Sequence, residues 1–232
     1  MMNGIDVSEH QGTIDWAKVN TDFVIIRSGY GREISQKDKF FEANYSGCKD
    51  RKIPCGTYWY SYAVTPEEAA KEAQICLEAI KGKKFEFPVY FDIEEPKTLA
   101  LGMAKCSAIA ESFLNVIEKA GFWAGIYSSK YTLENYITEQ IRSRYAVWVA
   151  HYDVTKTNYS GKFGIWQRSN TGNIPGIAGN VDLNNCYVDY PSEVKTAGLN
   201  GYSKSPATPP KRTKKFTIVE DGVKWSGTLT EE

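Results

Sequence analysis

Short apolar segments alternate with helix-like segments along most of the 232-residue chain. Each apolar segment is rich in β-branched and aromatic residues and is bounded by glycine, proline or polar residues, a pattern typical of buried strands. The segments between them carry helix signals such as capping residues, and Gly121 ends the longest of them. Eight strands are predicted, at residues 4–7, 23–27, 56–60, 89–93, 123–127, 145–150, 164–167 and 181–183.

Repeated strand–helix units with apolar strands require a parallel sheet covered by helices. Eight such units predict an α/β fold with a closed, TIM-like β/α barrel, and a doubly wound open sheet is the alternative. The helix signals thin out after residue 141, so the barrel is expected to be irregular in its last units. Helices are predicted at residues 14–19, 40–51, 65–81, 102–120 and 133–141.

The overall composition excludes several classes of protein. The formal net charge of zero argues against a nucleic-acid-binding protein. No segment approaches the roughly 18 apolar residues of a membrane span, and the first residues lack the basic and apolar regions of a signal peptide. The chain is therefore expected to be made in the cytoplasm without an export signal of its own.

The cysteines and histidines argue against a disulfide framework, a metal site or a cofactor. The five cysteines are odd in number and lack C-x-x-C spacing, so reduced thiols are expected. His10 and His151 are the only histidines, too few to support a histidine-ligated metal or a catalytic triad. We predict neither a metal nor a cofactor.

The segment from Phe87 to Pro96, FPVYFDIEEP, places two acids at the end of a predicted buried strand. Side chains alternate along a strand, so Asp92 and Glu94 should point the same way, with α-carbons roughly 6.6 Å apart. Like charges at that distance resist ionising together, so one carboxyl should hold a proton while the other stays anionic. This division suits acid-catalysed cleavage of a glycosidic bond. Capping of a neighbouring helix or pairing with lysines is the alternative.

Acids and aromatic residues also dominate the ends of the other predicted strands. Carboxylates bind hydroxyl groups and aromatic faces stack on sugar rings, which favours a carbohydrate cleft over a phosphate site. Packing at the rim of the barrel is the alternative for any single aromatic residue. The candidate acids are Asp6, Asp92, Glu94 and Asp182, and the candidate substrate-binding residues are Tyr60, Tyr62, Tyr127, Trp166 and Gln167.

A series of short motifs in chain order resembles glycoside hydrolase family 25, the muramidase-type lysozymes of phages, bacteria and fungi. The motifs are DVS and QG near the N-terminus, then IIRSGYG, GTYWYSYA, PVYFDIE, AGIYSS, WVAHY, WQ and VDLNN. The resemblance spans residues 4–190 and implies a modified β/α barrel that hydrolyses the β-1,4 bond between N-acetylmuramic acid and N-acetylglucosamine in peptidoglycan. It also implies that Glu94 is the general acid, Asp92 its partner carboxylate, and Asp6 and Asp182 two further acids of the cleft. Trp59 and Arg168 depart from residues common in the family, which affects the expected shape of the subsites.

The resemblance leaves the mechanism and two other functions open. Glu94, next to an anionic Asp92, is expected to have a raised pKa and to protonate the glycosidic oxygen. Either an aspartate or the substrate's own 2-acetamido group then attacks the anomeric carbon, and the D-x-E spacing favours the acetamido group. Another barrel glycosidase such as a chitinase is the alternative enzyme, and a wall-binding barrel without activity is the alternative to an enzyme. Release through a phage holin or by lysis of the host would bring such a protein to the wall.

The composition changes after the predicted barrel. We predict a catalytic domain at residues 1–197, an exposed Pro/Lys-rich linker at 198–215, and a β-hairpin tail at 216–232 with Asp221-Gly222 as a type I′ turn. In that register Phe216, Ile218, Val223 and Trp225 fall on one apolar face. A two-stranded hairpin with such a face needs cover, which could come from folding back on the barrel, from a longer wall-binding module of which the tail is a remnant, or from the same hairpin in other copies. The proline-rich linker argues against folding back, so a homo-oligomer formed through the tail is favoured.

Overall fold

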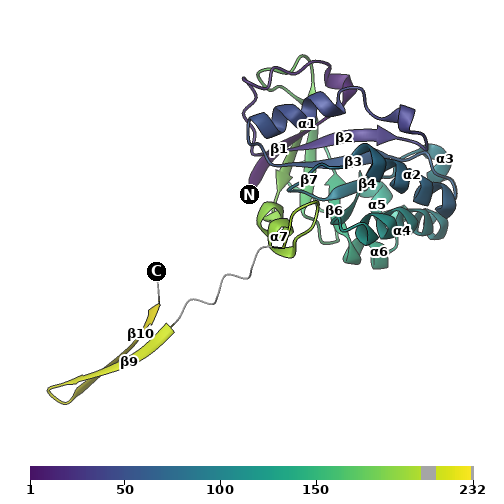
Figure 1. The fold of residues 1–232 in the computed structure, drawn as a ribbon. Helices are drawn as coiled ribbons and strands as arrows, with labels where there is room; N and C mark the ends of the chain where they lie inside the picture. The colour runs from purple at the N-terminus through teal and green to yellow at the C-terminus, as the bar shows by residue number, and fades with distance from the viewer. Residues whose placement is uncertain (205–212, 231–232) are drawn as a thin grey trace.

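The computed structural model describes residues 1–204 and 213–230. Eight strands form a closed barrel in chain order, as predicted, and a separate two-stranded sheet lies outside it (Figure 1). The barrel strands are β1 (Met2–Val7), β2 (Phe23–Tyr30), β3 (Cys55–Tyr60), β4 (Val89–Asp92), β5 (Ala124–Ser129), β6 (Ala146–Ala150), β7 (Ile165–Gly172) and β8 (Val181–Cys186).

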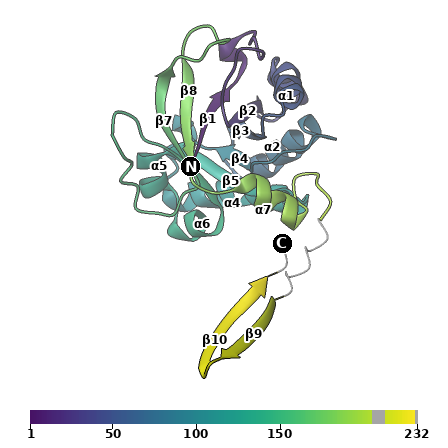
Figure 2. The same ribbon diagram turned by 90° about the vertical axis from the view of Figure 1, so that its left-hand side faces the viewer.

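The last strand reverses the direction of the barrel. Strands β1 to β7 pair in parallel, whereas β8 pairs antiparallel with both β7 and β1. The β7–β8 connection is short because no helix has to return the chain to the other end (Figure 2). The beginning of β8 therefore lies at the same rim as the C-terminal ends of the other strands.

Helices cover only part of the barrel. The elements are η1 (Glu9–Gln11), η2 (Ile34–Gln36), α1 (Phe41–Asp50), α2 (Pro66–Ala79), α3 (Pro96–Leu99), α4 (Met103–Lys119), α5 (Lys130–Tyr136), α6 (Glu139–Arg144) and α7 (Tyr190–Ala197). The predicted helices at 40–51, 65–81 and 102–120 are confirmed as α1, α2 and α4.

Two helix predictions were wrong. Residues 16–18 form a turn and residues 14, 15 and 19 form no regular element; the Asp15 N–H donates to the Gly176 carbonyl at 2.8 Å and not within a helix. The predicted helix at 133–141 is divided between α5 and α6. The extended backbone of Ile137 and Thr138 separates them, and the Ser107 hydroxyl accepts the Thr138 N–H.

The barrel has two apolar cores because side chains alternate along its strands. On β2, Phe23 and Ile25 point into the barrel, whereas Val24 and Ile26 pack between the strands and the helices. On β4, Tyr90 belongs to the inner core and Phe91 to the outer one. The same alternation decides which polar side chains at the rim face the mouth of the barrel.

The chain continues to pack on the barrel beyond the predicted domain end at residue 197. Asn200 is fully buried; its Nδ2 donates to the Phe87 carbonyl, and its Oδ1 accepts the Trp123 N–H. The Tyr202 hydroxyl donates to Glu86. The contacts of the barrel domain therefore extend to Tyr202, and much of the predicted linker, residues 205–212, lies outside the described residues.

The tail forms the predicted hairpin, β9 (Thr213–Glu220) and β10 (Val223–Thr230). Asp221 and Gly222 have φ angles of 50° and 78°, as a type I′ turn requires. The predicted register is confirmed: Glu220 pairs with Val223, residue 218 with Trp225, and residue 216 with Gly227. The side chains of residues 216 and 218 lie outside the described part, so the predicted apolar face is described only for Val223 and Trp225.

Candidate active site

A polar cleft of 180 Å³ opens at the mouth of the barrel. Its lining comes from the C-terminal ends of parallel strands, from η1, and from the beginning of the reversed β8. All four acids predicted from the sequence lie in it. The lining residues are Asp6, His10, Arg27, Tyr58, Tyr60, Asp92, Glu94, Tyr127, Trp148, Gln167 and Asp182.

Asp6 on β1 lies opposite Asp182 on β8 in the antiparallel register. Gln167 Nε2 donates to both, at 2.9 Å to Asp6 Oδ2 and 3.2 Å to Asp182 Oδ2, and Asn184 Nδ2 donates to Asp6 Oδ2 at 2.7 Å. Burial and the charge of Asp182 raise the pKa of Asp6 well above its ordinary value. Burial also raises the pKa of Asp182, and the hydrogen bond from Asp6 opposes this rise. The two carboxyls therefore titrate as a coupled pair, in which burial and the charge of Asp182 favour the protonated form of Asp6.

Asp92 ends β4 and is buried, with only 3% of its surface exposed. Its Oδ1 has no hydrogen-bond partner. Burial first, then the charges of Glu94 and Asp6, raise its pKa well above the ordinary value. Asp92 is thus a carboxyl group with a free oxygen in the cleft.

Glu94 lies two residues further, where its side chain is exposed to the cleft. The walls of the cleft still withhold much of the surrounding water, and this burial, followed by the charge of Asp182, raises the pKa of Glu94. The raised pKa is as predicted, but the neighbouring charge that was expected to contribute to it was wrong. The neighbouring charge that raises it belongs to Asp182, because Asp92 is itself too buried to ionise easily.

One arginine reaches the cleft, but two other acids already pair with it. Arg27 Nε donates to Asp38 Oδ2 at 2.7 Å, and Arg27 Nη2 donates to Glu9 Oε1 at 2.7 Å. Its Nη1 lies 3.4 Å from His10 Nε2. Asp38 and Glu9 balance the positive charge of Arg27, so this charge does not neutralise the carboxyl groups of the cleft.

The candidate substrate-binding residues divide between the cleft and the outer layer. Tyr60, Tyr127 and Gln167 line the cleft. Trp166 does not: it is 5% exposed, packs in the outer core and donates its Nε1–H to the His151 carbonyl at 2.8 Å. Neighbouring residues of a strand face opposite sides, so Trp166 and Gln167 cannot both enter the cleft.

Tyr62 lies beyond the end of β3 and is 43% exposed. Its ring contacts that of Tyr60 edge to face, with centroids 5.1 Å apart, and lies 6.1 Å from that of Tyr30. These three tyrosines form an aromatic rim next to the cleft.

Four cleft residues were missed as candidates, namely His10, Arg27, Tyr58 and Trp148. Trp148 lies in the middle of the predicted strand 145–150, where an apolar residue is expected to belong to the core. Its Nε1 donates to Asn184 Oδ1 at 2.8 Å, and its ring lies 4.3 Å from that of Tyr127. Alternation along the strands could have identified two of the four residues. Trp148 lies two residues before Ala150, and Tyr58 two residues before Tyr60, so each faces inward on its strand.

Residues 5–177 match the sequence profile of "Glycosyl hydrolases family 25". The chain belongs to glycosyl hydrolase family 25. This confirms the resemblance predicted from the motifs, and with it the class of glycoside hydrolases.

Three known proteins illustrate the similarity. An autolytic lysozyme of Clostridium acetobutylicum is 26% identical over 188 residues, covering 78% of this chain and 55% of that protein. The modular autolysin LytC of Streptococcus pneumoniae, solved with a synthetic peptidoglycan ligand, has a TM-score of 0.72 and 27% identity, covering 80% of this chain and 46% of LytC. The CTP1L endolysin shares the fold, with a TM-score of 0.72 and 23% identity, covering 84% of this chain and 70% of the endolysin.

A second hollow of 520 Å³ continues from the acidic cleft of this family 25 domain. The two share Glu94 and Tyr127. Its other residues follow β5 and β6, and they are Ser129, Lys130, Tyr131, Glu134, Ala150, His151 and Tyr152. A chain of sugars leaving the acids can therefore continue along this side of the barrel mouth.

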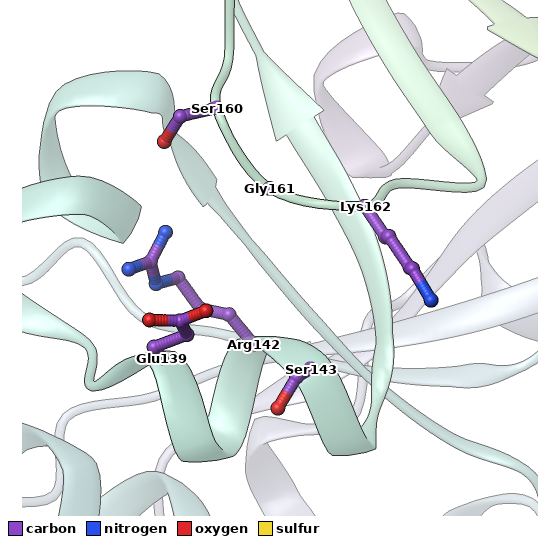
Figure 3. Close-up of a pocket in the computed structure, with 6 residues that line it drawn as sticks. All are labelled: Glu139, Arg142, Ser143, Ser160, Gly161 and Lys162. Atoms are coloured by element: carbon purple, nitrogen blue, oxygen red, sulfur yellow. The ribbon is translucent and has the colours of Figure 1, made fainter.

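A separate cavity of 440 Å³ lies between α6 and the loop that leads to β7 (Figure 3). Glu139, Arg142 and Ser143 project from α6, and Ser160, Gly161 and Lys162 lie on the loop. None of the four acids lines this cavity. Its charged residues are one acid, Glu139, and two bases, Arg142 and Lys162. The acidic cleft, which contains all four acids, is therefore the candidate active site.

Within residues 1–204 and 213–230, no group of three or more histidine, cysteine, aspartate or glutamate side chains is arranged to hold a metal ion. In the same ranges no helix is long and apolar enough to cross a bilayer. All five cysteines are buried and free in the structure, and their reduced state stays a prediction.

Proposed function

We propose that this family 25 domain is a lysozyme, a 1,4-β-N-acetylmuramidase that hydrolyses the bond between N-acetylmuramic acid and N-acetylglucosamine in bacterial peptidoglycan. The observation that carries the proposal is the convergence of Asp6, Asp92, Glu94 and Asp182 in one cleft, with every pKa raised. Similarity to two proteins, an autolytic lysozyme and an autolysin solved with a synthetic peptidoglycan ligand, supports this substrate.

Glu94 is the proposed general acid and base. It is the one acid of the four that is exposed to the cleft, and its raised pKa keeps it protonated at higher pH than an ordinary glutamate. It donates its proton to the glycosidic oxygen as the bond to the anomeric carbon breaks. The resulting carboxylate then removes a proton from water, which attacks the anomeric carbon from the same side.

Asp92 is the proposed partner that orients the 2-acetamido group of the substrate. Its buried Oδ1 lacks a protein partner and can accept the N–H of that group. The acetamido oxygen attacks the anomeric carbon from the side opposite the leaving group as the glycosidic bond breaks. The water activated by Glu94 then displaces the acetamido oxygen, so that two inversions give net retention. Direct attack by an aspartate is supported less well, because Asp6 is already held by Gln167 and Asn184.

Asp6 and Asp182 are proposed to set the charge of the cleft. As a coupled pair they leave one negative charge near Glu94, which raises the pKa of the acid. Tyr60, Tyr62 and Tyr127 are proposed to contact the sugar rings, and the hollow beyond Tyr127 extends the binding surface.

Mass spectrometry of the products from a defined cell wall tests the proposal. A muramidase leaves N-acetylmuramic acid at the new reducing end, whereas a glucosaminidase leaves N-acetylglucosamine. A reducing-end assay on chitin oligomers in parallel tests the chitinase alternative, and absence of cleavage of both with retained wall binding would indicate a wall-binding barrel. In a lytic setting, release through a holin or by lysis would bring the enzyme to the wall.

A further inference from the structure

Glu72 on α2 is fully buried and takes no part in the proposed chemistry. It lies on the side of α2 that faces the barrel, among Ala69, Ala73 and Cys76. Its Oε1 accepts the backbone N–H of Tyr62 at 3.0 Å, while its Oε2 has no partner. A buried carboxyl group with an unpartnered oxygen lowers the free energy of unfolding, so a gain in stability does not explain the presence of Glu72.

The turn that Glu72 contacts carries the aromatic rim. In residues 61–64, Ser61 N–H donates to the Asp92 carbonyl at 3.0 Å and Val64 N–H donates to Glu68 Oε2 at 2.8 Å. Ala63 N–H donates to the Ser61 hydroxyl at 3.1 Å. Each amide of the turn is thus held, and two of the four acceptors are carboxylates of α2.

The same turn is joined to the segment that carries Glu94. Thr98 on α3, which is fully buried, donates its hydroxyl hydrogen to the Ala63 carbonyl at 2.7 Å. The Tyr60 hydroxyl approaches Glu95 Oε2 at 3.5 Å. A displacement of the turn would therefore move Tyr62 relative to the acids that follow β4.

We propose that Glu72 is a positioning residue, which fixes the 61–64 turn through the Tyr62 amide and thereby holds the rings of Tyr62 and Tyr60 against the glycan. The inference rests on the proposed function, since it assigns the rim to sugar binding. It makes Glu72 a determinant of substrate affinity that never touches substrate or the reacting atoms.

Steady-state kinetics on soluble, uncrosslinked wall glycan tests this role. Glu72→Leu should raise KM about five-fold with kcat within two-fold, which corresponds to a loss of about 1 kcal/mol of binding. Glu72→Gln keeps an acceptor for the Tyr62 amide and should restore KM to within two-fold of the wild type. Glu78→Leu, on the exposed face of the same helix, is the matched control and should leave both constants unchanged.

A double-mutant cycle distinguishes positioning from general stabilisation. Tyr62→Ala removes a half-exposed ring, leaves the core intact and should raise KM by a similar factor. In the double variant with Glu72→Leu, the two effects should not add, because both act through one ring. Full additivity would overturn the proposal, and an unchanged KM in Tyr62→Ala would overturn it even if Glu72→Leu failed to fold.

Deuterium exchange separates this proposal from the proposed function. Peptides that cover residues 60–64 should exchange faster in Glu72→Leu than in the wild type and in Glu72→Gln, whatever the substrate. An inactive wild type with this exchange pattern would refute the lysozyme assignment while leaving the anchor of the turn in place. Unchanged exchange in Glu72→Leu would show that the carboxyl does not hold the turn.

Discussion

Asp6 and Asp182 face each other across the antiparallel pair of β1 and β8, and one amide nitrogen, Gln167 Nε2, binds both carboxyls. The Gln167 Oε1 in turn accepts from the Tyr127 hydroxyl at 2.7 Å. Gln167 was predicted to bind substrate, but these bonds occupy both ends of its amide. We therefore expect it to act on the charge of the cleft, and through it on Glu94.

Gln167→Leu should lower kcat about 10- to 100-fold and change KM little, because hydrogen bonds to charged groups contribute about 1.5–3 kcal/mol. Kinetics on soluble glycan measures this, with Asn170→Ala, at an exposed position of the same strand, as control. A rise in KM at unchanged kcat would instead restore Gln167 to the role of a sugar contact.

Glu94→Gln should keep the fold and the binding to walls but lose turnover by about 10²- to 10⁴-fold, since a glutamine has no proton to give to the leaving oxygen. Turbidity loss of a wall suspension measures activity, and cosedimentation with walls measures binding. Glu95→Gln, one residue away, is the matched control and should remain active. Near-native activity of Glu94→Gln would remove it from the role.

The free energy of unfolding should depend on pH through the protonation of the buried Glu72. Burial, and then opposing contributions from Ser61, Tyr62 and Arg32, leave its pKa at about 7, against 4.5 for an ordinary glutamate. The folded state therefore binds the Glu72 proton more tightly than the unfolded state does, and this difference stabilises the folded state. The stabilisation is complete below pH 4.5 and is lost as the pH rises to about 7. Relative to Glu72→Gln, the wild type should lose up to about 3 kcal/mol over this window. Urea unfolding of both proteins at each pH measures the difference, and parallel curves would contradict it.

Local patterns predicted most of the barrel and the acids. The apolar runs identified all eight strands, and the D-x-E spacing put Asp92 and Glu94 in one cleft, because both signals depend only on neighbouring residues. Asp182 was placed at the correct rim although β8 runs in the opposite direction. That reversal depends on pairing with β1, a contact between the two ends of the barrel, and no local signal specifies it.

The errors in the site come from the inward or outward direction of side chains. An apolar run such as WVA or GIW does not itself say which residues face the barrel, so Trp166 was chosen and Trp148 was missed. Gln167 in the cleft determines the direction of Trp166 by alternation. Likewise, the charge that raises the pKa of Glu94 was assigned to the nearest acid in sequence, whereas burial decides that Asp182 carries it.

The five buried cysteines should titrate as five thiols in denaturant without reductant. They should also react slowly in the folded protein, since none is exposed and burial raises the pKa of Cys76 to about 12. A thiol-reactive chromophore measures both the count and the rate. A count below five in fresh protein would reveal a disulfide that the structure does not contain.

The hairpin should make the chain self-associate. Trp225 and Val223, which lie on one face, are 62% and 53% exposed, and a two-stranded sheet is marginal in water unless its apolar face is covered. Light scattering should therefore give a mass above one chain for the full protein and a monomer for a version that ends at Lys204. That end point keeps Asn200, whose buried amide joins the chain to the barrel, so the shortened domain remains folded. Trp225→Lys in the full chain should also be monomeric. Lys224→Ala, on the opposite face, is the control and should associate like the wild type. A monomeric full chain would show that the hairpin does not mediate assembly.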